Sequence, residues 1–216
     1  MSGSLIQLLV LAGIALFLVF KLRDVLGTRG GFEPEGRPAP AQPIRPVPAP
    51  DAQPEPDDID DHAEPGSPIA TALRAMQAVE PGFAVTPFLN GARQAYEMIL
   101  MAFERGDLSD VRAFLAPAVA EALDSVIADR QSRGLTTEAQ FLGSRDTALQ
   151  AASFDPQTGL AELTVRFVGE LIVATRDASG EVVEGDPKAA RKQRDIWTFA
   201  RHMGQDDPNW QLVATG

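Results

Sequence analysis

The sequence predicts an α+β protein, in which N-terminal helices pack on a curved antiparallel sheet behind a transmembrane helix and a disordered Pro-rich tether. Three observations predict this organisation. Residues 1–20 contain no charged side chain, and residues 33–68 hold eleven of the seventeen prolines. In the remainder, helical spacing of apolar residues changes after Gly134 to the alternation typical of strands.

The first segment, residues 4–22, is long and apolar enough for a membrane anchor. Lys21, Arg23 and Arg29 follow the apolar run, and positive flanks stay on the cytoplasmic side. We therefore expect a single-pass protein of the cell inner membrane with its C-terminal domain facing the cytoplasm; a cleaved or soluble leader is the alternative. The anchor residues would include Leu5, Leu9, Ile14, Phe17 and Phe20.

The composition of the second segment, residues 23–67, predicts a disordered linker. From residue 33 to residue 68 there are nine acidic residues against two arginines, and almost no large apolar side chain. Such a composition cannot bury a core, and proline favours extended chain. We interpret it as a spacer, with a proline docking motif as the alternative reading.

Helical signals fill the first half of the remaining chain. Residues 68–81 predict an amphipathic helix, and the α+β domain is assigned to residues 82–216. Thr86 is expected to cap a long helix that ends at Gly106, because glycine adopts the left-handed conformation of a helix end. A short helix after Asp107 and a third from Pro117 to Gly134 complete the set.

Strand signals fill the second half. We expect one strand within residues 141–154, a turn at Asp155–Gly159, and a second strand from residue 161 to about residue 175. Residues 191–201 alternate again, and residues 210–214 predict a last short strand. Helices followed by an antiparallel sheet give the α+β class.

Composition excludes several functions. The formal net charge of −11 argues against general nucleic-acid binding, which needs Lys and Arg at phosphates. The chain has no cysteine, so thiolate metal sites and cysteine nucleophiles are excluded. No phosphate loop, zinc motif or nucleophile elbow is present, and neither His62 nor His202 stands in a ligand pattern. We expect no catalytic residue, no metal and no cofactor.

Several separated motifs, in order, resemble the Tim44-like family. They are Phe88–Ile99 with Ala102 and Phe103, Gly106–Leu108, Thr164–Phe167, Asp195–Arg201, and Pro208–Val213. The resemblance covers about residues 83–215. It implies a cone-like domain of the nuclear transport factor two and cystatin-like shape with an apolar pocket, as in the C-terminal domain of the mitochondrial inner-membrane import adaptor. The chaperone-binding region of that adaptor has no counterpart in this sequence.

Candidate site residues follow from the resemblance and from the aromatic content. The expected pocket walls are Tyr96, Ile99, Phe103, Phe167, Trp197, Phe199 and Trp210, with ordinary core packing as the alternative. The expected polar contacts to a partner or to anionic lipid are Arg166, Arg201, Asp195 and Glu170. The alternative is that the two arginines form structural ion pairs with Asp195 or Glu170.

The function we expect is that of a membrane-anchored adaptor that binds partner proteins at the inner membrane, in protein translocation or envelope assembly. The first alternative is a module that binds a lipid or a small apolar ligand. The second is an enzyme of the isomerase or dehydratase kind, which would show paired ionisable groups with a shifted pKa inside the pocket.

Overall fold

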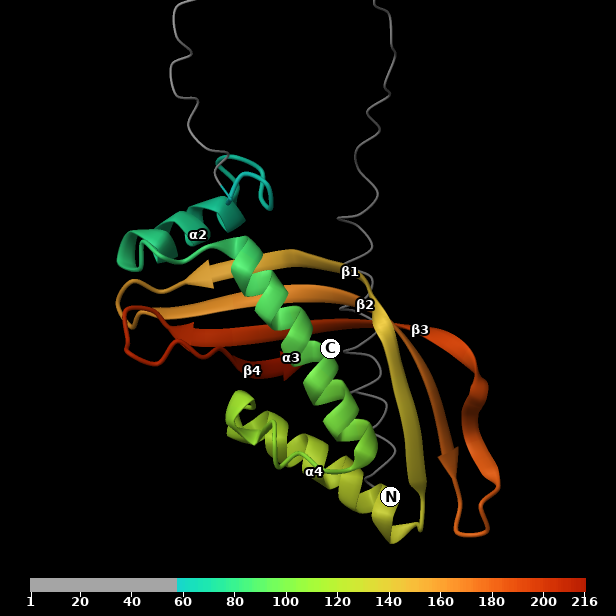
Figure 1. Ribbon diagram of the computed structural model, residues 1–216. Helices are drawn as coiled ribbons and strands as arrows, with labels where there is room; N and C mark the ends of the chain where they lie inside the picture. The colour runs from blue at the N-terminus through green and yellow to red at the C-terminus, as the bar shows by residue number, and fades with distance from the viewer. Residues whose placement is uncertain (1–57) are drawn as a thin grey trace, which may run out of the picture. The chain divides into compact units, whose positions relative to one another are not determined.

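The computed structural model describes residues 58–216, and the anchor and most of the linker expected from the sequence lie outside this range. Three helices cover one face of a four-stranded antiparallel sheet, as the strand alternation predicted (Figure 1). The helices are α2 (Pro68–Val79), α3 (Val85–Arg105) and α4 (Pro117–Ser132), with a 3-10 turn, η1, at Arg112–Phe114. None of the helices within residues 58–216 is long and apolar enough to cross a bilayer.

The last residues of the expected linker belong to the folded domain. Ile59 is 1% exposed and packs in the core, and Arg74 of α2 pairs with Asp60 at 2.7 Å. Asp58 accepts hydrogen bonds from the backbone amides of Val85 and Thr86 and from the Thr86 hydroxyl. Residues 58–67 therefore differ from the expected disordered linker, because one buried isoleucine and a capping carboxylate attach them to the helices.

Helix α3 lies diagonally across the sheet (Figure 1). Its buried residues recur at helical spacing, from Val85 through Phe88, Ala92 and Tyr96 to Ile99. Gly106 ends it in the left-handed conformation at φ 77°, as the sequence predicted. Its start differs from expectation. Ala84 occupies the N-cap position without a side-chain bond, and the carboxylate that binds the free amides comes from 27 residues upstream.

The segment between α3 and α4 contains less helix than the sequence predicted. The Asp107 carboxylate accepts a bond from the Ser109 amide at 2.9 Å, which forms a turn, and only three residues at η1 are helical. Helix α4 begins at Pro117 as expected. Leu115 of this segment forms a single bridge with Leu212 of β4, so the segment links the helical layer to the sheet.

The sheet has the order β1-β2-β3-β4 with every neighbouring pair antiparallel. Its strands are β1 (Thr136–Phe154), β2 (Leu160–Arg176), β3 (Val182–His202) and β4 (Gln211–Thr215). The first and third are longer than the sequence predicted. Register shifts interrupt β1 three times, and the long strands curve around the helices (Figure 1).

The core lies between the helices and β2. Alternate residues of β2 face the helices and are buried, including Leu163, Val165, Phe167 and Leu171, whereas the residues between them are half-buried on the other face. Each such side chain contributes about 1.5–3 kcal/mol when fully removed from water. The helical layer thus fixes one face of the sheet as interior.

Candidate ligand pocket

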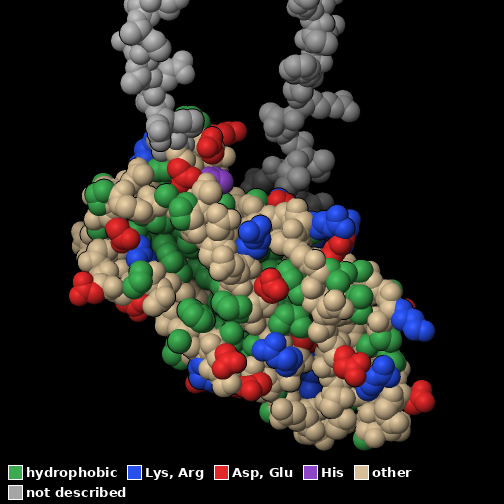
Figure 2. All heavy atoms as spheres, viewed as in Figure 1, with side chains coloured by type: hydrophobic (Ala, Val, Ile, Leu, Met, Phe, Trp, Pro, Cys, Tyr) green, Lys and Arg blue, Asp and Glu red, His purple; other side chains and the backbone are tan. Residues whose placement is uncertain are grey.

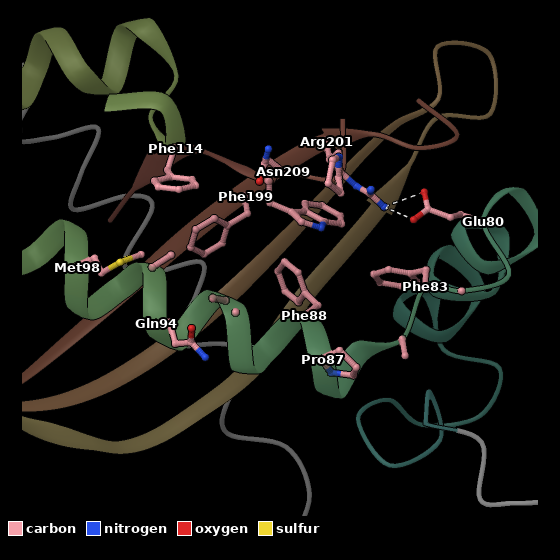
Figure 3. Close-up of a pocket in the computed structure, with 17 residues that line it drawn as sticks. Glu80, Phe83, Pro87, Phe88, Gln94, Met98, Phe114, Phe199, Arg201 and Asn209 are labelled. Carbon is pink, nitrogen blue, oxygen red and sulfur yellow. Dashed lines mark hydrogen bonds and ion pairs between the residues drawn. The ribbon is translucent and has the colours of Figure 1, made fainter. Parts of the chain in front are cut away.

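A cavity of about 490 Å³ opens on the helical side of the domain. It lies between the first half of α3, the chain that joins α2 to α3, the end of β3 and the loop before β4 (Figure 3). Figure 2 shows hydrophobic side chains gathered on this face, with acidic and basic side chains around them. The lining residues are Glu80, Gly82, Phe83, Ala84, Pro87, Phe88, Gly91, Ala92, Gln94, Ala95, Met98, Phe114, Phe199, Arg201, Pro208, Asn209 and Trp210.

Five of the residues that line the cavity are aromatic, and the rings of four of them pack against one another. Phe88 stands edge-on to Trp210 with ring centroids 4.8 Å apart, and to Phe199 at 6.1 Å. Phe83 lies 6.2 Å from Trp210. Phe88 follows Pro87 in the first turn of α3, and its ring points from the helix into the cavity (Figure 3). At the rim, Met98 is 45% exposed, so the apolar wall continues to the surface.

One end of the cavity is charged. Arg201 Nη2 donates to both carboxylate oxygens of Glu80, at 2.8 and 2.9 Å (Figure 3). The Gly204 amide donates to the same carboxylate at 3.4 Å. The guanidinium is 5.2 Å from the centroid of the Trp210 ring. Arg201 is 8% exposed, and its Nε atom is buried without a hydrogen-bond partner among residues 58–216.

This ion pair does not have the properties of a catalytic pair. The hydrogen bond from Arg201 holds the pKa of Glu80 below its usual value, although burial opposes the shift. A general acid needs the opposite change, a raised carboxyl pKa, and a guanidinium does not give up its proton in proteins. The pair instead joins the end of α2 to the end of β3, so it fixes the shape of the pocket.

Two of the seven expected pocket residues, Phe199 and Trp210, line this cavity. The other five are Tyr96, Ile99, Phe103, Phe167 and Trp197, and none of them lines it. Tyr96 is fully buried and stacks on Phe167 with ring centroids 4.5 Å apart, while Trp197 stands edge-on to it at 4.9 Å. Tyr96, Ile99, Phe167 and Trp197 are buried core residues, in agreement with the alternative interpretation, whereas Phe103 is only partly buried. Phe103 lies under Arg130, whose guanidinium is 4.3 Å from the ring centroid.

The Tyr96 hydroxyl donates a 2.6 Å hydrogen bond to Asp195, one of the four expected polar contacts. Burial raises the pKa of Tyr96, and the adjacent Asp195 carboxylate raises it further. Neither residue lines the cavity described above. The bond therefore anchors α3 to β3 inside the core.

The other three expected polar contacts also form structural pairs. Arg166 pairs with Asp146 at 2.7 Å, Glu170 pairs with Arg145 at 2.6 Å, and Arg201 pairs with Glu80. Sequence reasoning anticipated such pairs but named Asp195 and Glu170 as the acids for the two arginines, and the structure gives different acids.

Within residues 58–216 no group of three or more His, Cys, Asp or Glu side chains is placed to hold a metal ion. His62 Nε2 lies 2.8 Å from the Thr86 hydroxyl, and His202 Nδ1 lies 3.1 Å from the Thr158 carbonyl. Both histidines thus make local contacts in the folded domain.

Comparison with known proteins finds two proteins that are similar to parts of this chain. A human protein, "Mitochondrial import inner membrane translocase subunit TIM44", is 24% identical over 148 residues, which is 67% of this chain and 32% of that protein. The chain thus spans about a third of the length of this relative. The intermembrane space region of the chloroplast protein ARC6 aligns with 57% of this chain and 94% of that one, at 12% identity and a TM-score of 0.35. The family model described as Tim44-like domain matches residues 69–216, and the chain therefore belongs to the Tim44-like family.

Proposed function

We propose that this protein is a membrane-anchored adaptor, whose domain faces the cytoplasm and holds partner proteins at the cell inner membrane for protein translocation or envelope assembly. Membership of the Tim44-like family supports a role related to translocation. The apolar run at residues 4–22 supports a single-pass anchor. The proposal includes no catalytic step.

The observation that carries the proposal is the aromatic cavity between α3 and β3, open at Met98. Protein interfaces place large apolar side chains in such pockets, because aromatic walls offer area at little entropic cost. An anchor and a spacer confine the pocket near the membrane, which raises the effective concentration of a membrane-bound partner to about millimolar. A shallow pocket then suffices for retention.

The test is site-specific photocrosslinking in native membranes with the full chain. A crosslinking amino acid at Met98 is expected to capture a discrete set of proteins. Leu142 on β1 has a similar exposure, 46% against 45%, and serves as the matched control position.

A second variant tests the pocket itself. Gly91 lines the cavity, and a Cβ added there meets no atom within 4 Å, so Gly91→Leu extends a side chain into open space. The captured set at Met98 should disappear in this variant. A set that survives Gly91→Leu unchanged, or that equals the set at Leu142, would refute partner binding at the pocket.

Topology can be tested because the natural chain has no cysteine. A single Leu142→Cys substitution should react with a membrane-impermeant maleimide only after the inner membrane is opened. Labelling with the inner membrane intact would place the domain on the opposite side. If carbonate washing released the full chain into the soluble fraction, the proposal of a membrane anchor would be refuted.

The cavity volume favours a second candidate function, binding of a lipid or a small apolar ligand. About 490 Å³ lies within the range of about 300–1,000 Å³ that small-molecule pockets occupy. Native mass spectrometry of the detergent-purified chain would then show a bound mass that Gly91→Leu abolishes. A ligand-free spectrum together with protein crosslinks at Met98 would favour the adaptor.

A further inference from the structure

The second edge of β3 is largely unpaired. Strand β4 pairs with β3 only from Trp197 to Ala200, and Ile196 then exchanges two backbone hydrogen bonds with Gly216, each 2.8 Å long. Beyond Ile196, towards the start of β3, no other described residue bonds this edge. Figure 1 shows this part of β3 at the margin of the sheet.

The Ile196 bonds establish which backbone groups face the open edge. Because both the N–H and the C=O of Ile196 point towards Gly216, the same groups two and four residues earlier point the same way. These are the N–H and C=O groups of Arg194 and Lys192, while Gln193 and Asp195 direct theirs to β2. The strand is in regular register with β2 from Arg191 to Phe199, so this alternation holds across the edge.

Positive charge surrounds the same groups. Residues 187–194 contain Lys188, Arg191, Lys192 and Arg194 and no acidic residue, in a chain of net charge −11. All four side chains are exposed, and none forms an ion pair within 4.0 Å with another residue of 58–216. Glu170, which stands opposite Lys192 in the register, binds Arg145 and also feels the charge of Lys192, although those two side chains form no ion pair within 4.0 Å. An unpaired edge and cations outside any close ion pair thus occur together.

We propose that the β3 edge from Arg191 to Asp195 is a docking site for an extended acidic segment of a partner protein, which adds to the sheet as a strand beside β3. Backbone bonds to Lys192 and Arg194 would supply the pairing, and carboxylates at alternate positions of the segment would meet their side chains on the outer face of the sheet. This site is separate from the aromatic cavity and names the chemistry of a partner contact for the proposed adaptor.

The charge and the unpaired backbone groups of the β3 edge favour an acidic protein segment over a second copy of the chain, a membrane or a nucleic acid. A second copy of the chain, paired edge to edge, would bring Lys192 and Arg194 opposite the same cations, and like charges directly opposite destabilise a strand pair. An anionic membrane or a nucleic acid would use the cations but would leave the backbone groups of the edge unpaired. Lysine on an edge can also serve to prevent aggregation, in which case no acidic segment would bind.

The experiment uses the full chain in neutral detergent micelles and a fluorescent heptapeptide that alternates glutamate with valine and threonine. We expect saturable binding that weakens as salt rises, and slower hydrogen exchange of the Lys192 and Arg194 amides when the peptide is bound. A peptide with lysine for each glutamate, and one with proline at the central valine, are the controls and should bind at least about tenfold more weakly.

Two substitutions at one position separate charge from backbone pairing. Lys192→Gln removes a cation, and Lys192→Pro removes the cation and the outward N–H without touching the bonds to β2. We expect Lys192→Pro to weaken binding about threefold to tenfold more than Lys192→Gln, the cost of one hydrogen bond. Arg105→Gln, at an exposed cation at the end of α3, should leave binding unchanged.

Three outcomes would overturn the proposal. They are no binding of the acidic peptide at low salt, equal binding by Lys192→Gln and Lys192→Pro, and binding without slower exchange at the Lys192 and Arg194 amides. The last two would show electrostatic attraction without strand addition, as a membrane surface would give. None of these results bears on crosslinking at Met98, so the proposed adaptor function stands or fails separately.

Discussion

Alkaline pH should destabilise this protein through one residue, Tyr96. It is the single tyrosine of the chain, and it is fully buried with its hydroxyl 2.6 Å from Asp195. Burial and the neighbouring carboxylate both raise its pKa above the ordinary value of 10.0. The folded state therefore keeps the phenol proton at pH values where the unfolded chain loses it.

The sign and size of the effect follow from linkage. A raised folded pKa means that the contribution of Tyr96 is complete below pH 10.0 and is lost as the pH rises towards the folded pKa. At pH 11 the unfolded state gains about 1.4 kcal/mol from ionising one tyrosine, and each further pH unit adds about 1.4 kcal/mol while the folded phenol stays protonated. The free energy of unfolding should fall by these amounts.

The assay combines urea unfolding, followed by tryptophan fluorescence between pH 8 and pH 11.5, with absorbance of tyrosinate at 295 nm. Tyr96→Phe should lower the free energy of unfolding at pH 8 by about 1.5–3 kcal/mol, because a hydrogen bond to a charged group is lost. At pH 11 the difference in the free energy of unfolding between the natural chain and Tyr96→Phe should be smaller by about 1.4 kcal/mol, because only the natural chain is destabilised by tyrosine ionisation. Tyrosinate that forms near pH 10 in a protein that is still folded would show that the hydroxyl is not buried as described.

Three further predictions concern glycine positions, the pocket ion pair and the helix cap, all measured by urea unfolding. Gly91→Ala should raise the free energy of unfolding by about 0.5–1 kcal/mol, because Gly91 lies in a helix with open space around it. Gly185→Ala should lower the free energy of unfolding by more than about 2 kcal/mol, because Gly185 has a φ of +79° and a Cβ there would clash with the backbone carbonyl oxygen of Val173 in β2. Glu80→Gln should cost about 1.5–3 kcal/mol at neutral pH, because the buried Arg201 guanidinium loses a charged acceptor that is itself 32% exposed. Because the Glu80 pKa is lowered, this contribution to stability should be present above the ordinary pKa of 4.5 and be lost as the pH falls. Asp58→Ala should cost about 1–2 kcal/mol as the loss of a helix cap; a cost near zero would mean that residues 58–67 do not hold the start of α3.

Signals within a few residues predicted the course of the chain well. Gly106 and Gly134 both adopt positive φ at the helix ends where the sequence placed them, and the Asp155–Gly159 turn joins β1 to β2. Each feature depends on a conformational preference of one residue or on a bond to a near neighbour. The cap of α3 depends instead on Asp58, which the acidic linker composition concealed, because a carboxylate 27 residues away gives no local pattern.

The pocket could be predicted only in part, because helical spacing shows which side chains share a face but not what lies beneath each of them. Phe88 and Tyr96 occupy the same face of α3, about 12 Å apart along its axis. Tyr96 lies over the centre of the sheet, where Gly169 in β2 leaves room for the phenol: a Cβ there would lie 3.1 Å from the hydroxyl. Phe88 lies where β3 ends and the loop before β4 turns away, so the rings around it enclose space rather than fill it. The glycine at 169, which interrupts the alternating large residues of β2, was the sequence signal that a side chain approaches the strand closely there.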